Sequence, residues 1–171
     1  MINRGGSVVN FERLPILNYL KLRQPDDIVY TATEHYMNTA AWYLKQGQNM
    51  TKALRAAANA VDTADEAAVQ DPGLNLIPQC EARLLQCAVL SKSGQHEQAF
   101  SRVYETNRLL DNFWEFSQDA VLTKGFWKLF AKLKANALKC LAIEGEFLHL
   151  PLDILEQLNS QRDRFIQDEA H

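Results

Sequence analysis

The chain has 171 residues, of which 47% are hydrophobic and 23% are charged, and its formal net charge is −3. We expect one soluble domain over residues 1–171, because this length can bury its own core and no long apolar run is free of charge. The small acidic excess argues against a nucleic-acid binder, since counterion release needs a basic surface. Residues 1–25 either pack against the domain or form a loosely packed N-terminal extension.

The start of the chain and its cysteines indicate the compartment. The first fifteen residues, MINRGGSVVNFERLP, lack the sustained apolar region of a signal peptide, so we expect a cytoplasmic protein without a membrane span. The chain has three cysteines, Cys80, Cys87 and Cys140. An odd number in a chain with ordinary core content favours small buried side chains in a reducing compartment over disulfides.

Motifs for metal, cofactor or catalytic chemistry are missing from the sequence. Cys80 and Cys87 are separated by about 10 Å along a helix, too far to share one metal ion. The histidines lack the spacing of a zinc motif, and no Gly-x-Ser-x-Gly nucleophile motif occurs. We therefore expect no metal, no cofactor and no catalytic residue.

Helical periodicity and the near absence of alternating β-branched runs predict an all-α protein of about seven helices. The first helix is expected over residues 11–22. The second begins at Pro25, because proline suits the first helical turn, and runs to Gln46. Gly47 ends it, and an alanine-rich third helix follows over residues 49–70.

The segment DPGLNLIP, residues 71–78, is the clearest interruption, because Asp, Pro and Gly are turn formers. We expect a hinge there. The fourth helix then starts at Pro78 and runs to about residue 92. Gly94 takes the usual glycine position after a helix end and separates it from a fifth helix over residues 96–110.

The sequence LLDNFWEFSQD is expected to turn the chain after the fifth helix. Ser117 or Asp119 then caps a sixth helix that extends to about residue 144, since both residue types are good N-caps. Pro151 begins a seventh helix.

The glycine between the fourth and fifth helices lies in a pattern of small and large residues. Cys87 and Leu90 lie seven and four residues before Gly94, and Ala99 and Val103 lie five and nine residues after it. Small side chains let two antiparallel helices approach closely, and large apolar ones pack beside them. The pattern resembles the tetratricopeptide repeat, which implies stacked helical hairpins and a protein that binds other proteins.

A similar arrangement surrounds Gly47, with Tyr36, Ala40 and Tyr43 before the glycine and Ala53 after it. The two tyrosines take the aromatic positions of the first helix of a hairpin, and Ala40 takes the small one. The resemblance therefore extends to a second hairpin.

Gly145 marks a third predicted hairpin, although Lys134, Leu138 and Leu141 fill the positions before it. The three glycines are about 50 residues apart, and typical repeats have a period of about 34. The resemblance, which covers about residues 30–168, thus implies long helices or long linkers. The alternative is an irregular antiparallel bundle.

Aromatic residues concentrate in one stretch of eighteen residues, which predicts either core packing or a partner interface. They are Phe113, Trp114, Phe116, Phe126, Trp127 and Phe130. Trp114 lies near the expected turn and is the better interface candidate.

Lysines form a second candidate surface. Lys124, Lys128 and Lys132 recur every four residues and so share one side of a helix. This side is either a solvated face or a seat for an acidic peptide. The carboxylate clamp of some tetratricopeptide domains is not carried over, because Met37 and Ala41 occupy its lysine and asparagine positions.

These patterns predict a non-enzymatic interaction module, such as an adaptor, chaperone or regulator, that binds another protein or a peptide. The predicted partner-binding residues are Tyr36, Tyr43, Trp114, Lys124, Lys128 and Lys132. The alternative is an architectural subunit that forms a homo-oligomer through its aromatic patch.

A remote alternative is a small helical ribonuclease similar to the HEPN family, which pairs an arginine with a histidine a few residues later. Arg164 and His171 have suitable spacing. A chain end, however, rarely holds a catalytic base in a fixed position.

Overall fold

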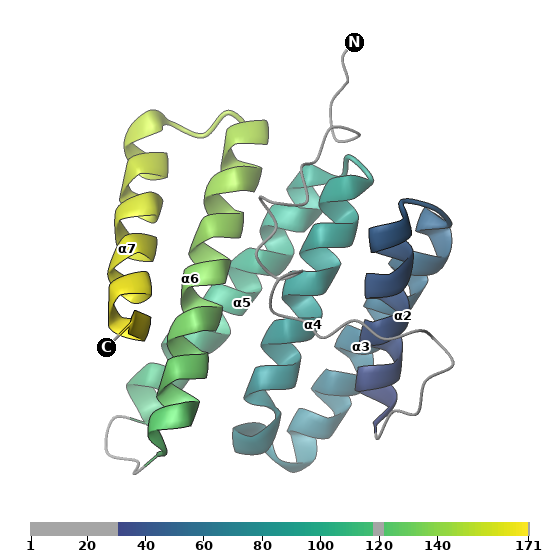
Figure 1. Ribbon diagram of the computed structural model, residues 1–171, viewed down its shortest axis with the longest axis horizontal. Helices are drawn as coiled ribbons and strands as arrows, with labels where there is room; N and C mark the ends of the chain where they lie inside the picture. The colour runs from purple at the N-terminus through teal and green to yellow at the C-terminus, as the bar shows by residue number, and fades with distance from the viewer. Residues whose placement is uncertain (1–30, 118–121, 171) are drawn as a thin grey trace.

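The computed structural model describes residues 31–117 and 122–170, and within them it contains six α-helices and no strand (Figure 1). The prediction of an all-α protein is confirmed. The predicted helix over residues 11–22 and the predicted Asp119 cap lie outside the described residues. The helices are α2 (Ala32–Gln46), α3 (Met50–Gln70), α4 (Pro72–Lys92), α5 (His96–Phe116), α6 (Lys124–Phe147) and α7 (Leu152–Ala170).

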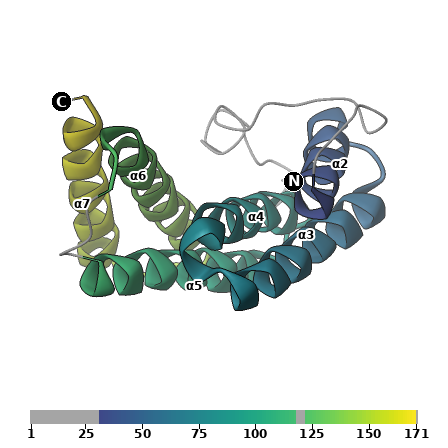
Figure 2. The same ribbon diagram turned by 90° about the horizontal axis from the view of Figure 1, so that it is seen from below.

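Each helix packs against the next one along the chain. In addition, α2 contacts α4 and α4 contacts α6, whereas among the described residues α3, α5 and α7 make few contacts with one another. The helices thus form two layers, and Figure 2 shows that the array curves, with α2, α4 and α6 on its inner side. None of the described helices combines the length and apolar character needed to cross a bilayer.

Helix α2 begins later than predicted. Thr31 is its N-cap, with extended backbone dihedrals, and the Thr31 hydroxyl accepts a hydrogen bond from the Glu34 N–H at 3.0 Å. The helix that ends at Gln46 therefore starts at Ala32 and not at Pro25. A threonine cap satisfies a helix-end donor directly, which a proline start does not do.

The predicted hinge over residues 71–78 is wrong, because only Asp71 separates α3 from α4. The Asp71 carboxylate accepts a hydrogen bond from the Leu74 N–H at 3.1 Å, and Pro72 takes the first helical position. Pro78 lies inside α4 and does not start it. Proline has no N–H for the Leu74 carbonyl, but Leu74 is exposed, so water can satisfy that oxygen.

The end of α5 and the start of α6 also differ from the prediction. α5 continues through Phe116, and Ser117 is its C-cap and not the N-cap of α6. Thr123 caps α6 instead, since its hydroxyl accepts from the Phe126 N–H at 3.1 Å. The ring centres of Phe113 and Phe126 are 5.4 Å apart. This contact packs the last turns of α5 against α6, which favours a helix there over the predicted turn.

Gly145 does not mark a turn, which corrects the third predicted hairpin position. It is buried inside α6, and the chain turns after Phe147. A Cβ atom at Gly145 would lie 2.8 Å from Cδ1 of Leu150 and 2.9 Å from Cδ2 of Leu155. The glycine is needed here because α7 and the preceding turn approach α6 closely.

The other two glycines do mark turns. Gly47 and Gly94 have left-handed φ angles of 70° and 79°, and they follow α2 and α4. The small residues Ala40, Cys87 and Ala99 are all fully buried. Small side chains at these positions allow the close helix packing that the sequence pattern predicts.

Arg83 joins three helices in an ion-pair network. From α4 it donates two hydrogen bonds of 2.8 Å to the Asp65 carboxylate on α3, and its Nε donates to Glu105 on α5 at 3.1 Å. Burial alone would raise the pKa of Asp65, but the hydrogen bonds from Arg83 and Gln79 hold that pKa below its ordinary value. Ionised Asp65 therefore stabilises the fold.

Asp65→Asn is expected to flatten the dependence of stability on acid pH. Because the pKa of Asp65 is lowered by folding, its contribution is complete above the unfolded-chain pKa of 3.8 and is lost as the pH falls through the folded pKa. At neutral pH we expect a loss of at most about 1 kcal/mol, since the carboxylate is partly exposed. Urea unfolding between neutral pH and the acid range measures both effects. Asp62→Asn, exposed on the same helix, should keep the wild-type slope, and an equal slope in both variants would contradict the assignment.

Candidate functional site

The predicted partner-binding residues lie in separate parts of the array. Tyr36 and Tyr43 are on α2, where they are partly buried and pack against the core. The predicted lysines and Trp114 are at the other end of the array, on α6 and α5 (Figure 1). The structure therefore does not bring the tyrosines together with the other four residues.

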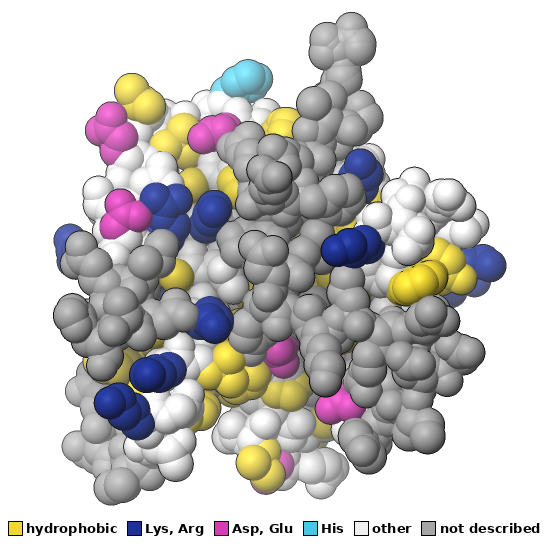
Figure 3. Space-filling view, viewed as in Figure 1, with side chains coloured by type: hydrophobic (Ala, Val, Ile, Leu, Met, Phe, Trp, Pro, Cys, Tyr) yellow, Lys and Arg dark blue, Asp and Glu magenta, His cyan; other side chains and the backbone are white. Residues whose placement is uncertain are grey.

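The lysines form an exposed row. Lys124, Lys128 and Lys132 are all exposed on α6. Figure 3 shows basic side chains along α6 on the face that also carries α2 and α4. Lys128 and Lys132 line a hollow of about 390 Å³ together with Gly125 and Leu129. Lys124, Lys128 and Lys132 therefore present positive charge along one exposed side of α6.

The aromatic residues at the end of α5 and the start of α6 form a packed cluster, which we call the aromatic cluster. It consists of Phe113, Trp114, Phe126, Trp127 and Phe130. Trp114 meets Trp127 edge to face at 5.5 Å, and Phe130 is buried. Trp114, however, is 50% exposed, and nearby Phe116 is 88% exposed. The cluster is thus part core and part surface.

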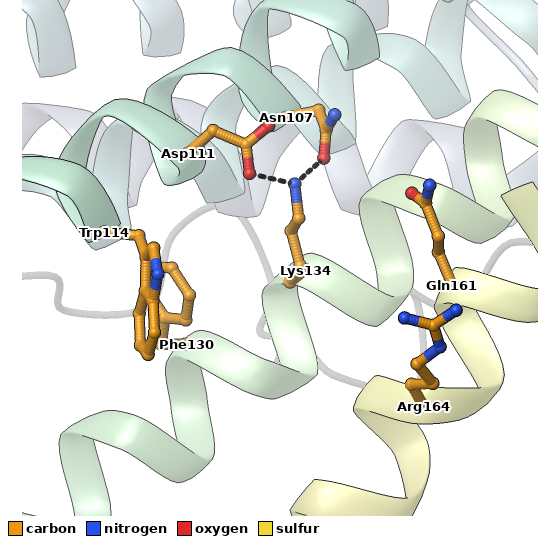
Figure 4. A pocket seen from close by; sticks show the side chains of 7 residues that line it. All are labelled: Asn107, Asp111, Trp114, Phe130, Lys134, Gln161 and Arg164. Atoms are coloured by element: carbon orange, nitrogen blue, oxygen red, sulfur yellow. Dashed lines mark hydrogen bonds and ion pairs between the residues drawn. The ribbon is translucent and has the colours of Figure 1, made fainter.

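A cleft of about 500 Å³ lies beside the aromatic cluster, between α5, α6 and α7 (Figure 4). It combines aromatic, amide and charged side chains. Helix α5 contributes Asn107, Asp111 and Trp114, α6 contributes Phe130 and Lys134, and α7 contributes Gln161 and Arg164.

Lys134 forms the polar floor of the cleft. Its side chain is only 8% exposed, and its ammonium group donates hydrogen bonds to Asp111 at 2.5 Å and to Asn107. Desolvation lowers the pKa of Lys134, although the hydrogen bond to Asp111 acts in the opposite direction. The Asp111 carboxylate is largely exposed, so its charge is partly screened by water and compensates the buried ammonium incompletely.

Arg164 and Gln161 form the wall on α7. Figure 4 shows both side chains extending from α7 toward Lys134. Arg164 is exposed and makes no ion pair with any side chain that the structure describes, whereas neighbouring Arg162 pairs with Asp163 at 2.8 Å. His171 lies outside the described residues, so the ribonuclease pair of the sequence analysis is not placed.

The sequence indicates Trp114 as an interface candidate and Arg164 only as half of a ribonuclease pair, and it does not indicate the cleft. Lys134 appeared only as an ill-fitting residue of the third hairpin. The run from Leu129 to Leu141 holds three lysines, Lys132, Lys134 and Lys139, so their occurrence in the sequence does not single out Lys134. Its partners Asp111 and Asn107 are on another helix, and no spacing within one helix indicates that contact.

A second polar pair is buried at the other end of α6. Nδ1 of His96, the first residue of α5, lies 3.0 Å from Oε2 of Glu144, and the imidazole stacks on Phe147 with 3.8 Å between ring centres. Glu144 is only 1% exposed. This pair joins the start of α5 to the end of α6.

The three cysteines are buried thiols. The hydrogen bond with Cys140, together with burial, raises the pKa of Cys87 well above its ordinary value, and burial raises the pKa of Cys80 to about 12. A buried thiol of raised pKa is a poor nucleophile, because the thiolate is the reactive form. The described residues contain no group of three side chains placed to hold a metal ion.

Comparison with known proteins adds no relative: no family model matches the chain, and neither a curated protein nor a solved structure does. What this protein does is therefore inferred from its own side chains. Among the described residues, the cleft and the lysine row each combine a hollow with charged side chains.

Proposed function

We propose that this protein is a non-enzymatic interaction module that binds a partner protein through its helical surface. The observation that carries the proposal is Trp114, which is fixed by ring contacts with Trp127 and Phe130 and yet is half exposed beside the cleft. An aromatic side chain that is already ordered buries a large area at little entropic cost, and such residues are frequent hot spots.

The helix contacts support a tetratricopeptide-like array of three hairpins, α2–α3, α4–α5 and α6–α7. The first helices of the hairpins contact one another in a row, while the second helices hardly touch. Helices α3, α4 and α5 have 21 residues each, which accounts for a period longer than the typical 34 or so. Such an array offers extended surfaces for binding.

Side-chain contacts between the helices also suit a surface that is ordered before a partner binds. Arg83 ties α3, α4 and α5 together, and Lys134 ties α5 to α6. A surface that is ordered before binding loses little conformational entropy when the partner docks.

Trp114→Ala is expected to weaken partner binding by about tenfold or more, because truncation of a hot-spot tryptophan typically costs above 1 kcal/mol. The measurement is affinity capture from the native cells with quantitative mass spectrometry, followed by a dissociation constant for each captured protein. Tyr104→Ala is the matched control, since Tyr104 is equally exposed on α5 but does not line the cleft. A partner that is retained by the Trp114 variant would contradict the proposal.

Self-association is the second candidate, and the exposure of Phe116 next to Trp114 favours it. Two copies could bury these rings against each other. Sedimentation at several concentrations separates the candidates. A concentration-dependent oligomer that Trp114→Ala dissolves supports the architectural subunit, whereas a monomer at all concentrations supports a separate partner.

A further inference from the structure

Among the described side chains that line the cleft between α5, α6 and α7, positive charge exceeds negative charge by one. These side chains include two cations, Lys134 and Arg164, and one carboxylate, Asp111. Asp111 is already engaged by Lys134 at 2.5 Å. Arg164 on the opposite wall has no counter-charge among the described side chains.

We infer that this cleft binds a peptide segment of the partner through an Asp or Glu side chain that pairs with Arg164, next to an aromatic or large aliphatic side chain that packs on Trp114. The inference rests on the proposed function and names the ligand that one site would take.

The α7 wall suits a carboxylate. A guanidinium presents a planar fork of donors that matches the two oxygens of a carboxylate. Gln161 lies three residues before Arg164 and so shares its face of the helix, where its amide can donate a further hydrogen bond. A cationic ligand would be repelled by Lys134 and Arg164. A phosphate dianion would carry more negative charge than the single excess cation balances.

The α5 wall suits an apolar neighbour of that carboxylate. The ring of Trp114 is half exposed, and Phe130 supports it from behind at 6.2 Å between ring centres. A volume of about 500 Å³ falls in the range of known ligand sites and can hold a few side chains. The two walls, α5 and α7, make few contacts with each other among the described residues, so a peptide can enter between them.

Lys134, on the floor of the cleft, also favours an anionic ligand. Desolvation disfavours the charged form of Lys134 and lowers its pKa. A carboxylate bound nearby would favour the charged form again. Lys134 therefore adds attraction for an anion even though it is already hydrogen-bonded.

The lysine row is a different surface. Lys132 and Lys134 are two residues apart on α6 and point in nearly opposite directions. An acidic peptide attracted only by general positive charge would bind at Lys128 and Lys132. The experiment must separate these two locations.

The probes are synthetic peptides titrated into the full-length, isotope-labelled protein and followed by nuclear magnetic resonance. They are acetyl-Gly-Glu-Phe-Gly-amide, its Gln and Lys analogues, and acetyl-Gly-Gly-Phe with a free terminal carboxylate. We expect the Glu peptide to shift the Trp114 indole N–H and the Arg164 Nε–H. Its dissociation constant should be at least about tenfold lower than that of the Gln analogue, a difference of about 1.4 kcal/mol.

Two variants locate the carboxylate. Arg164→Gln should reduce the preference for the Glu peptide to less than about threefold, whereas Lys128→Gln should leave it unchanged. Arg164→Glu should reverse the preference in favour of the Lys peptide. Both Arg164 variants are expected to fold, because Arg164 is exposed and has no described ion pair.

Equal binding of the Glu and Gln peptides would overturn the inference, as would a preference that Arg164→Gln leaves intact. Tighter binding of the free terminal carboxylate would overturn the assignment to a side chain. Partner capture that depends on Trp114 but not on Arg164 would refute this inference and leave the proposed function standing. Partner capture that does not depend on Trp114, together with tight Glu-peptide binding that still shifts the Trp114 indole N–H, would refute the proposed function and leave the ligand preference of the cleft standing.

Discussion

Ala99→Leu is expected to lower the free energy of unfolding by about 3 kcal/mol. Ala99 is fully buried in α5, a few residues after the Gly94 turn that joins α4 to α5. Close packing leaves no room for three additional carbon atoms, so the two helices must move apart or distort. Urea unfolding followed by circular dichroism measures the loss.

The neighbouring position supplies the control. Gln98 is exposed on the same turn of α5, so Gln98→Leu should change stability by no more than about 0.5 kcal/mol. If Ala99→Leu were equally mild, the close approach of α4 and α5 would not depend on a small side chain there. The proposed tetratricopeptide-like packing of this hairpin would then lose its physical basis.

Local patterns predict the helices and two of their turns. The alanine-rich run that forms α3 and the glycines after α2 and α4 are indicated by residues close together in sequence. The errors occur where one side chain overrides a general preference. Asp71 caps α4 directly after α3, so no hinge separates the two helices. Phe113 packs against Phe126, and α5 continues past the predicted turn.

The cleft could not be predicted because the residues that line it come from three helices. The spacing of residues within one helix shows which side chains share a face, but not which face of another helix lies opposite. Lys134 pairs with Asp111 on α5 and shares the cleft with Arg164 on α7. Both the ion pair and the shared cleft depend on how the helices cross. Gly145 illustrates the same limit, since a glycine needed for helix contact resembles a turn glycine in sequence.

His96→Leu is expected to lower the free energy of unfolding at neutral pH by about 3 kcal/mol. The imidazole is the hydrogen-bond partner of one oxygen of Glu144, which is 1% exposed. Leucine keeps much of the volume against Phe147 but removes the polar contact. A carboxylate that remains buried after losing a partner is costly, because water cannot replace the missing interaction.

The double variant separates the loss of a partner from the loss of packing. When Glu144→Leu is combined with His96→Leu, neither a buried carboxylate nor an unmatched imidazole remains, so the double variant should be more stable than the sum of the two single losses predicts. His35→Leu, at an exposed histidine of α2, should remain within about 0.5 kcal/mol of the wild type. Additive losses in the double variant would instead show that His96 and Glu144 act independently, and that apolar packing alone holds the start of α5 against the end of α6.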